Sequence, residues 1–281
     1  MKLTTSKLPD YFTIASPTNS HYKTETNTFD FVDNGSDNLV VTVGESWTYG
    51  ADVVEDDNDP ARLEHVYGAL VAKELKADWL NLGQRGAGNF WIAERVEELS
   101  QILSKLNYQQ VYVVCTFTEP GRSFDSHHDR YIDYITWFKE NTPDKFLEFL
   151  NTECINRIKS ALNTFNNVTL RIGVNFVDPC GFPNTKEFLQ KSWIDLIAEK
   201  NNFTMTPCYV SDFGVFDLRN ARDFFPDPAV FLTWMNDLID KSGERYLIIR
   251  DKRYFVNMHP YAHDHITWAN YILESLNVPV G

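Results

Sequence analysis

Short apolar runs alternate along the chain with longer segments in which apolar residues recur at helical spacing. The runs predict buried strands, and the spaced segments predict helices. The predicted strands are 38–43, 79–82, 111–115, 168–176, 203–209 and 246–249. The predicted helices are 59–75, 92–106, 144–165, 186–199, 227–240 and 262–276. This alternation indicates an α/β fold, a flavodoxin-like three-layer α/β/α sandwich with a central parallel sheet of about five strands.

The polar stretch of residues 1–37 contains isolated aromatic residues, and it predicts an N-terminal extension packed on a domain formed by residues 38–281. Segment 117–143 is longer than an ordinary connection, so we expect an insertion that covers the active end of the sheet. Ligands of parallel α/β sheets bind beyond the carboxyl ends of the strands. The loops that follow the predicted strands are therefore the places to search for a site.

The composition excludes several classes of protein. The chain has 281 residues, 43% of them hydrophobic, which excludes a disordered or collagen-like chain. Its net charge of −13 argues against nucleic-acid partners and anionic membrane surfaces. Neither a membrane span nor an apolar signal segment is visible, so we expect a cytoplasmic or otherwise soluble protein. The four cysteines lack metal-ligand or redox spacing and are expected to be buried free thiols.

The loop after the first predicted strand reads Gly44-Glu45-Ser46-Trp47-Thr48-Tyr49-Gly50. A serine just past a strand end can present its Oγ in the crevice, and a following helical turn would point backbone N–H groups at the same place. The segment lacks the Gly-Lys-Ser/Thr ending of a phosphate-binding loop. A plain turn is an equally good interpretation of this segment alone.

Two further loops carry candidate chemistry. Gly83, Gly86 and Gly88 follow the second strand, where exposed N–H groups can form half of an oxyanion hole. Alternatively, these glycines only make a tight connection, with Asn89 as a helix N-cap. Near the C-terminus, Pro260 keeps His259 out of the last helix and in the loop before it. A nucleophilic serine needs such a base within reach.

Together, these segments resemble the sequence blocks of the SGNH or GDSL-type serine esterases and lipases. Gly44-Glu45-Ser46 stands where that family usually has Gly-Asp-Ser. Asn81, Gly83 and Gly86 match its Asn-x-Gly-x-x-Gly block, and Asn257-Met258-His259-Pro260 matches its final His-Pro block. The resemblance spans residues 39 to 276 in the family's order.

The resemblance implies a serine-dependent carboxylic-ester hydrolase that needs no metal or cofactor. Ser46 would be the nucleophile and His259 the general base, and the N–H groups of Ser46 and Gly86 would hold the oxyanion. The substrate would be a small-molecule ester or an acylated carbohydrate. The residues expected to contact it are Glu45, Trp47, Thr118, Glu119 and Arg122, although a surface salt bridge is the more ordinary role for the last.

The sequence departs from the family at two positions. The third-block Asn, an oxyanion donor, is missing after the third strand, and Asn89 is the better substitute for it, ahead of Thr118. The residue two before His259 is Asn257 instead of an aspartate. An amide can orient the imidazole but cannot stabilise the imidazolium by charge. The site therefore operates as a dyad, recruits another carboxylate such as Asp251 or Asp264, or is slow.

These departures keep a second function open. A binding protein on a hydrolase scaffold, which recognises an ester or a carbohydrate with little turnover, fits the same blocks. The run His263-Asp264-His265 looks metal-like, but adjacent helical residues point in different directions, so no metal is expected. The sequence leaves the acyl and alcohol specificity and the oligomeric state open.

Overall fold

The computed structural model describes residues 2–3, 29–51, 53–54, 59–85, 87–118, 150–175, 184–200, 208–211, 214–217, 246–249, 252–256 and 259–278. The predicted helix 227–240 and most of the insertion at 117–143 lie outside these residues.

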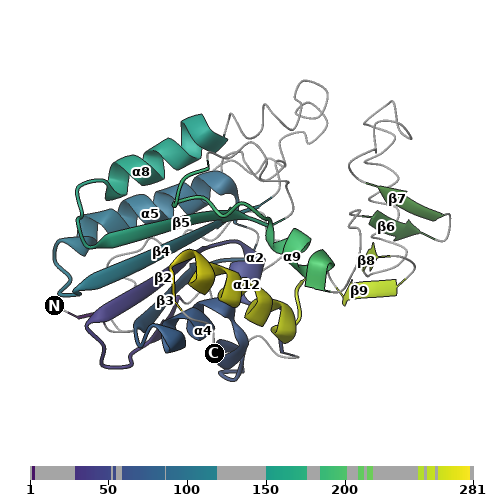
Figure 1. The fold of residues 1–281 in the computed structure, drawn as a ribbon, viewed down its shortest axis with the longest axis horizontal. Helices are drawn as coiled ribbons and strands as arrows, with labels where there is room; N and C mark the ends of the chain where they lie inside the picture. The colour runs from purple at the N-terminus through teal and green to yellow at the C-terminus, as the bar shows by residue number, and fades with distance from the viewer. Residues whose placement is uncertain are drawn as a thin grey trace.

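A five-stranded sheet forms the centre of the fold, in the order β1-β3-β2-β4-β5 (Figure 1). Its strands are β1 (Asp30–Val32), β2 (Asn38–Gly44), β3 (Asp78–Gly83), β4 (Gln110–Phe117) and β5 (Val168–Val174). The last four are mutually parallel, which confirms four of the predicted strands and an α/β fold.

The fifth strand of the sheet differs from the prediction. It is β1, which comes from the expected N-terminal extension and runs antiparallel to β3. The segment 33–37 between β1 and β2 is too short for the crossover that two parallel strands require. The expectation of a wholly parallel sheet is therefore wrong at this edge.

Two antiparallel hairpins lie apart from the central sheet in Figure 1. They pair β6 (Cys208–Ser211) with β7 (Gly214–Asp217), and β8 (Tyr246–Ile249) with β9 (Lys252–Val256). The predicted strand at 246–249 is confirmed. Of the predicted strand at 203–209, only residues 208–209 are described; they form part of β6, outside the central sheet. An apolar run indicates a strand but does not specify its partner.

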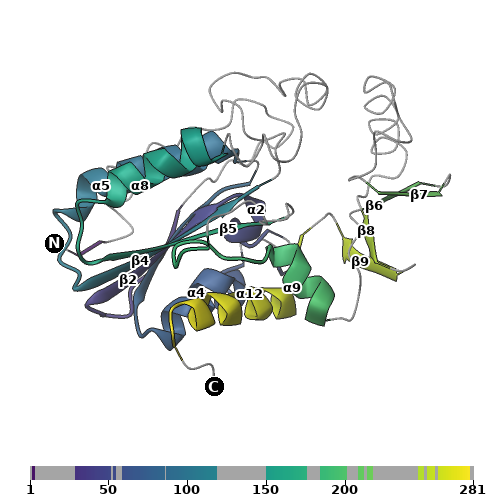
Figure 2. The same ribbon diagram turned by 45° about the horizontal axis from the view of Figure 1, so that its top comes forward.

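Helices cover both faces of the sheet, as Figure 2 shows. The helices α5 (Asn89–Leu103) and α8 (Asn156–Leu162) lie on one face, and α8 follows the π-helical segment η3 (Leu150–Ile155). The helices α4 (Tyr67–Glu74) and α12 (Ala262–Ser275) lie on the other, with α9 (Trp193–Lys200) beside them. Each face of the sheet has its own apolar cluster, and consecutive residues of β2 alternate between the two.

Two of the predicted helices differ from the structure for identifiable reasons. The predicted helix 59–75 is divided into α3 (Arg62–His65) and α4, because Val66 between them is extended, with φ −75° and ψ 137°. The predicted helix 186–199 begins only at Trp193, because Phe188 forms a parallel bridge with Ile172 beside β5. Cys115 and Cys154 are buried and free, as predicted, and burial raises the pKa of both thiols.

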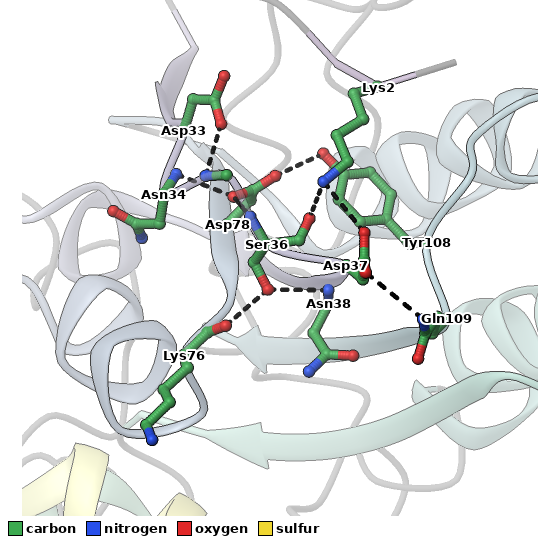
Figure 3. A network of polar contacts seen from close by, with 11 residues as sticks. Lys2, Asp33, Asn34, Ser36, Asp37, Asn38, Lys76, Asp78, Tyr108 and Gln109 are labelled. Atoms are coloured by element: carbon green, nitrogen blue, oxygen red, sulfur yellow. Dashed lines mark hydrogen bonds and ion pairs between the residues drawn. The ribbon is translucent and has the colours of Figure 1, made fainter.

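The amino ends of the strands are joined by a polar network, shown in Figure 3. The buried carboxylate of Asp78, at the start of β3, accepts the N–H groups of Asn34 and Ser36 at 2.9 and 3.0 Å. It also accepts the Tyr108 hydroxyl at 3.0 Å. Burial and the neighbouring Asp78 raise the pKa of Tyr108. The network fixes the β1–β2 connection at the end of the sheet opposite to Ser46.

Candidate active site

Ser46 lies where β2 ends and the short helix α2 (Ser46–Tyr49) begins. Glu45 is the N-cap of this helix, and its side chain accepts the N–H of Trp47 at 3.0 Å. The glycine at position 44 is required, because a Cβ there would overlap the side chain of Thr48. Local sequence thus dictates a sharp strand-to-helix turn that presents Ser46 at the carboxyl end of the sheet.

His259 reaches Ser46 from the opposite end of the sequence. Its Nε2 lies 2.9 Å from the Oγ of Ser46, and the two residues are 213 positions apart. The imidazole belongs to the loop that leads through Pro260 into α12. The structure therefore brings the two principal predicted site residues into direct contact.

Glu45 provides a carboxylate at the same place. Its side chain is only 1% exposed, and it accepts hydrogen bonds from the Ser46 hydroxyl and from the amide nitrogen of Asn175. Asn175 directly follows β5, and its buried Oδ1 has no hydrogen-bond partner in the described part of the chain. Asn175 was missed from the sequence; the signal available was a polar residue at the carboxyl end of an apolar parallel strand.

Asn89 and Thr118, the two candidates for the missing oxyanion donor, contact each other. The Thr118 N–H donates to Asn89 Oδ1 at 2.9 Å, and Asn89 Nδ2 donates to the Thr118 carbonyl at 3.3 Å. Both side chains are buried. The Asn89 amide therefore joins the start of α5 to the chain just after β4. Gly88, and not Asn89, occupies the N-cap position of α5.

The remaining predicted site residues are placed as follows. Trp47 is buried in the apolar core and meets Trp193 edge to face, with ring centroids 5.1 Å apart. Asp264 accepts the N–H of Tyr261 at 3.0 Å and so caps α12. Roles for the other candidates stay predictions, because these lie outside the described residues: Gly86, Glu119, Arg122, Asp251 and Asn257.

A second histidine, His265 on α12, is fully buried near His259. Its Nδ1 accepts the N–H of Tyr67 at 3.2 Å, and its ring stacks on that tyrosine and meets Trp193 edge to face. Burial, reinforced by the nearby His259 and His65, lowers its pKa from 6.5 to about 3. His265 is therefore a neutral imidazole at physiological pH.

The C-terminal end of α2 contacts a largely buried ion pair. Arg62, 4% exposed, donates two hydrogen bonds to the carboxylate of Asp30 on β1, at 2.8 and 2.9 Å. It also donates to the carbonyl of Tyr49, the last residue of α2, and its guanidinium lies 4.1 Å from the ring centroid of the same residue. Burial raises the pKa of Asp30, and the charge of Arg62 opposes this shift.

Neither a metal cluster nor a membrane-spanning helix is found in the described part of the chain: no three His, Cys, Asp or Glu side chains converge there, and no helix is long and apolar enough to cross a membrane. No protein-family profile matches the sequence, and no curated protein sequence matches it either.

Proposed function

We propose that the protein is a serine-dependent carboxylic-ester hydrolase that acts through an acyl-enzyme on Ser46, on a three-layer scaffold of the SGNH type. The observation that carries the proposal is the 2.9 Å contact between Ser46 Oγ and His259 Nε2 at the carboxyl end of the sheet. A serine beside an imidazole at hydrogen-bond distance is the arrangement that activates a hydroxyl as a nucleophile.

The proposed reaction has two steps. The Oγ of Ser46 attacks the acyl carbonyl carbon, and its proton passes to Nε2 of His259. The bond to the alcohol then breaks, and the alcohol oxygen takes the proton from the imidazolium. Water repeats the sequence on the acyl ester and restores Ser46. The N–H groups of Ser46 and Gly86 are the proposed donors to the oxyanion.

The proposed substrate is a small neutral ester or an acylated carbohydrate. The net charge of −13 works against strongly anionic substrates, because like charges repel. Glu119 and Arg122, which follow β4 in the sequence, are the proposed contacts to the substrate. Thr118 is fully buried beside Asn89, so we do not propose it as a contact.

Labelling with a fluorophosphonate tests the nucleophile directly. We expect the probe to attach to Ser46, as located by peptide mass analysis, and we expect Ser46→Ala to lose at least about 100-fold in the hydrolysis of p-nitrophenyl acetate. The matched control is Ser104→Ala, which changes an exposed serine at the end of α5 and should leave the rate unchanged. Equal hydrolysis by the Ser46→Ala and unmodified proteins would refute the assignment.

A binding protein with little turnover is the second candidate. The Asn89 amide is bonded to the backbone of Thr118, and position 257 carries an amide in place of the acid. Both features reduce the expected stabilisation of the transition state. Binding of an acetylated oligosaccharide in calorimetry without release of acetate would favour this function, and rapid turnover of any ester would exclude it.

A further inference from the structure

The hydroxyl of Ser46 has one proton and two neighbours that accept protons. It donates to the carboxylate of Glu45, and the same oxygen lies 2.9 Å from Nε2 of His259. One proton cannot serve both neighbours. If it points to Glu45, Nε2 of His259 must be the donor in the second contact, and it is then unable to act as a base.

The carboxylate is the stronger competitor for this proton. Hydrogen bonds to an ionised acceptor are about twice as strong as bonds between neutral groups. Glu45 is also held in place: its Oε1 accepts from the Trp47 N–H and from the Asn175 amide, so its Oε2 is directed at Ser46. At 1% exposure, little water is available to solvate the carboxylate instead.

We propose that Glu45 is a positioning residue that restrains the nucleophile, because it holds the Ser46 proton away from His259 in the resting site. This inference rests on the proposed function, since it assumes that His259 is the base. The hydroxyl must rotate from Glu45 to His259 before it attacks the substrate. The resembled family usually has aspartate here, which is one methylene shorter.

The substitution Glu45→Gln tests whether Glu45 and His259 compete for the Ser46 proton. The glutamine carbonyl can still accept from Trp47 and Asn175, while its NH2 group can only donate to Ser46 Oγ. The Ser46 proton is then left for His259. We expect the second-order rate constant for fluorophosphonate labelling of Ser46 at pH 7.5 to rise on the order of fivefold, the difference between a charged and a neutral hydrogen bond.

Substitution of His259 supplies the readout that a merely structural role would not give. We expect His259→Ala to abolish the gain, so that the Glu45→Gln/His259→Ala and His259→Ala proteins label at the same slow rate. Glu45→Asp, which keeps the charge and shortens the side chain, should also label faster than the unmodified protein, and it tests the proposal if the glutamine variant does not fold.

The outcomes separate the two proposals. Labelling of Ser46 in the unmodified protein, with an unchanged or slower rate in folded Glu45→Gln and Glu45→Asp proteins, overturns the restraint and leaves the hydrolase standing. A gain that persists without His259 also overturns it. No labelling of Ser46 in any of these folded proteins overturns both.

Discussion

Among the single residues, His265 has a charge state that is strongly controlled by the fold. Its ring is fully buried against Tyr67 and Trp193, and its pKa falls to about 3, against 6.5 for an ordinary histidine. The unfolded chain therefore binds a proton at this histidine between pH 6.5 and 3, and the folded protein does not. Over that range, acid favours unfolding, and the contribution is lost as the pH falls.

This titration predicts a slope of stability with pH. His265 alone should lower the free energy of unfolding by about 1.4 kcal/mol for each pH unit below 6.5. Urea unfolding at pH 7, 6, 5 and 4 measures the total slope, to which carboxylates also contribute. His265→Gln removes only the histidine term, so its slope should be shallower by that amount. Parallel slopes for the two proteins would contradict the assignment.

Of the residues that meet at the candidate site, the sequence indicated the two that lie in short motifs, Ser46 and His259. Ser46 follows an apolar strand directly, and Pro260 fixes His259 in a loop. The contact of Glu45 with Asn175 could not be predicted, because it joins residues 130 positions apart. In the sheet, β4 lies between β2 and β5, so the Glu45–Asn175 hydrogen bond reaches across the carboxyl end of β4. Side-chain reach between strands depends on their order, which no local pattern specifies.

Among the elements, the short helices α2 and α3 are joined by the side chain of Arg62. Both helices have only four residues, too few for independent stability. The ion pair of Arg62 with Asp30 connects α3 to β1, and the bond from Arg62 to the Tyr49 carbonyl connects it to the end of α2. Arg62 thus ties the end of the short helix that begins at Ser46 to β1 through a largely buried ion pair.

Removal of one partner should therefore be costly. Arg62→Met leaves the Asp30 carboxylate, which is 14% exposed, without its cation. Breaking a fully buried pair costs about 3–5 kcal/mol, so for this partly buried carboxylate we expect a loss on the order of 2–3 kcal/mol in the free energy of unfolding. Asp30→Asn/Arg62→Met should recover part of this loss, because no unpaired charge remains. The matched control Lys73→Met changes an exposed cation on α4 and should shift stability by less than about 0.5 kcal/mol. Equal losses of stability in Arg62→Met and Lys73→Met, measured by urea unfolding, would show that the ion pair is not the cause of the destabilisation.

The element boundaries show where apolar spacing is a poor guide. Leu63, Val66 and Leu70 have helical spacing, yet Val66 is extended and divides α3 from α4. Its side chain is buried in the same apolar cluster as the α4 residue Val71, so apolar spacing alone does not reveal the break. Likewise, β1 has only three residues and no apolar run of its own. The chain reversal at 33–37 explains its antiparallel direction, but no local pattern indicates that it pairs with β3 instead of β2.

Across the described part of the molecule, the two ends of the central sheet carry different polar groups. The Asp78 network holds the amino ends of the strands, and the Glu45–Ser46–His259 contacts lie at the carboxyl ends. The six-residue strand β3 runs between them, about 20 Å at the usual rise per residue. The expectation of a site at the carboxyl ends requires only the direction of parallel strands. Ser46 and His259, the two residues it singled out, do meet at that edge.

This separation predicts that stability and reactivity can be changed independently. Tyr108→Phe removes one of the hydrogen bonds to the buried Asp78 carboxylate and should lower the free energy of unfolding by about 1.5–3 kcal/mol. The rate of fluorophosphonate labelling at Ser46, measured well below the melting temperature, should stay within about twofold, because nothing in the network touches the site. Tyr112→Phe, a partly buried tyrosine on β4, is the control for loss of a hydroxyl alone. A labelling rate that fell with stability in Tyr108→Phe would mean that the sheet transmits the change from one end to the other, and that the two ends do not act independently.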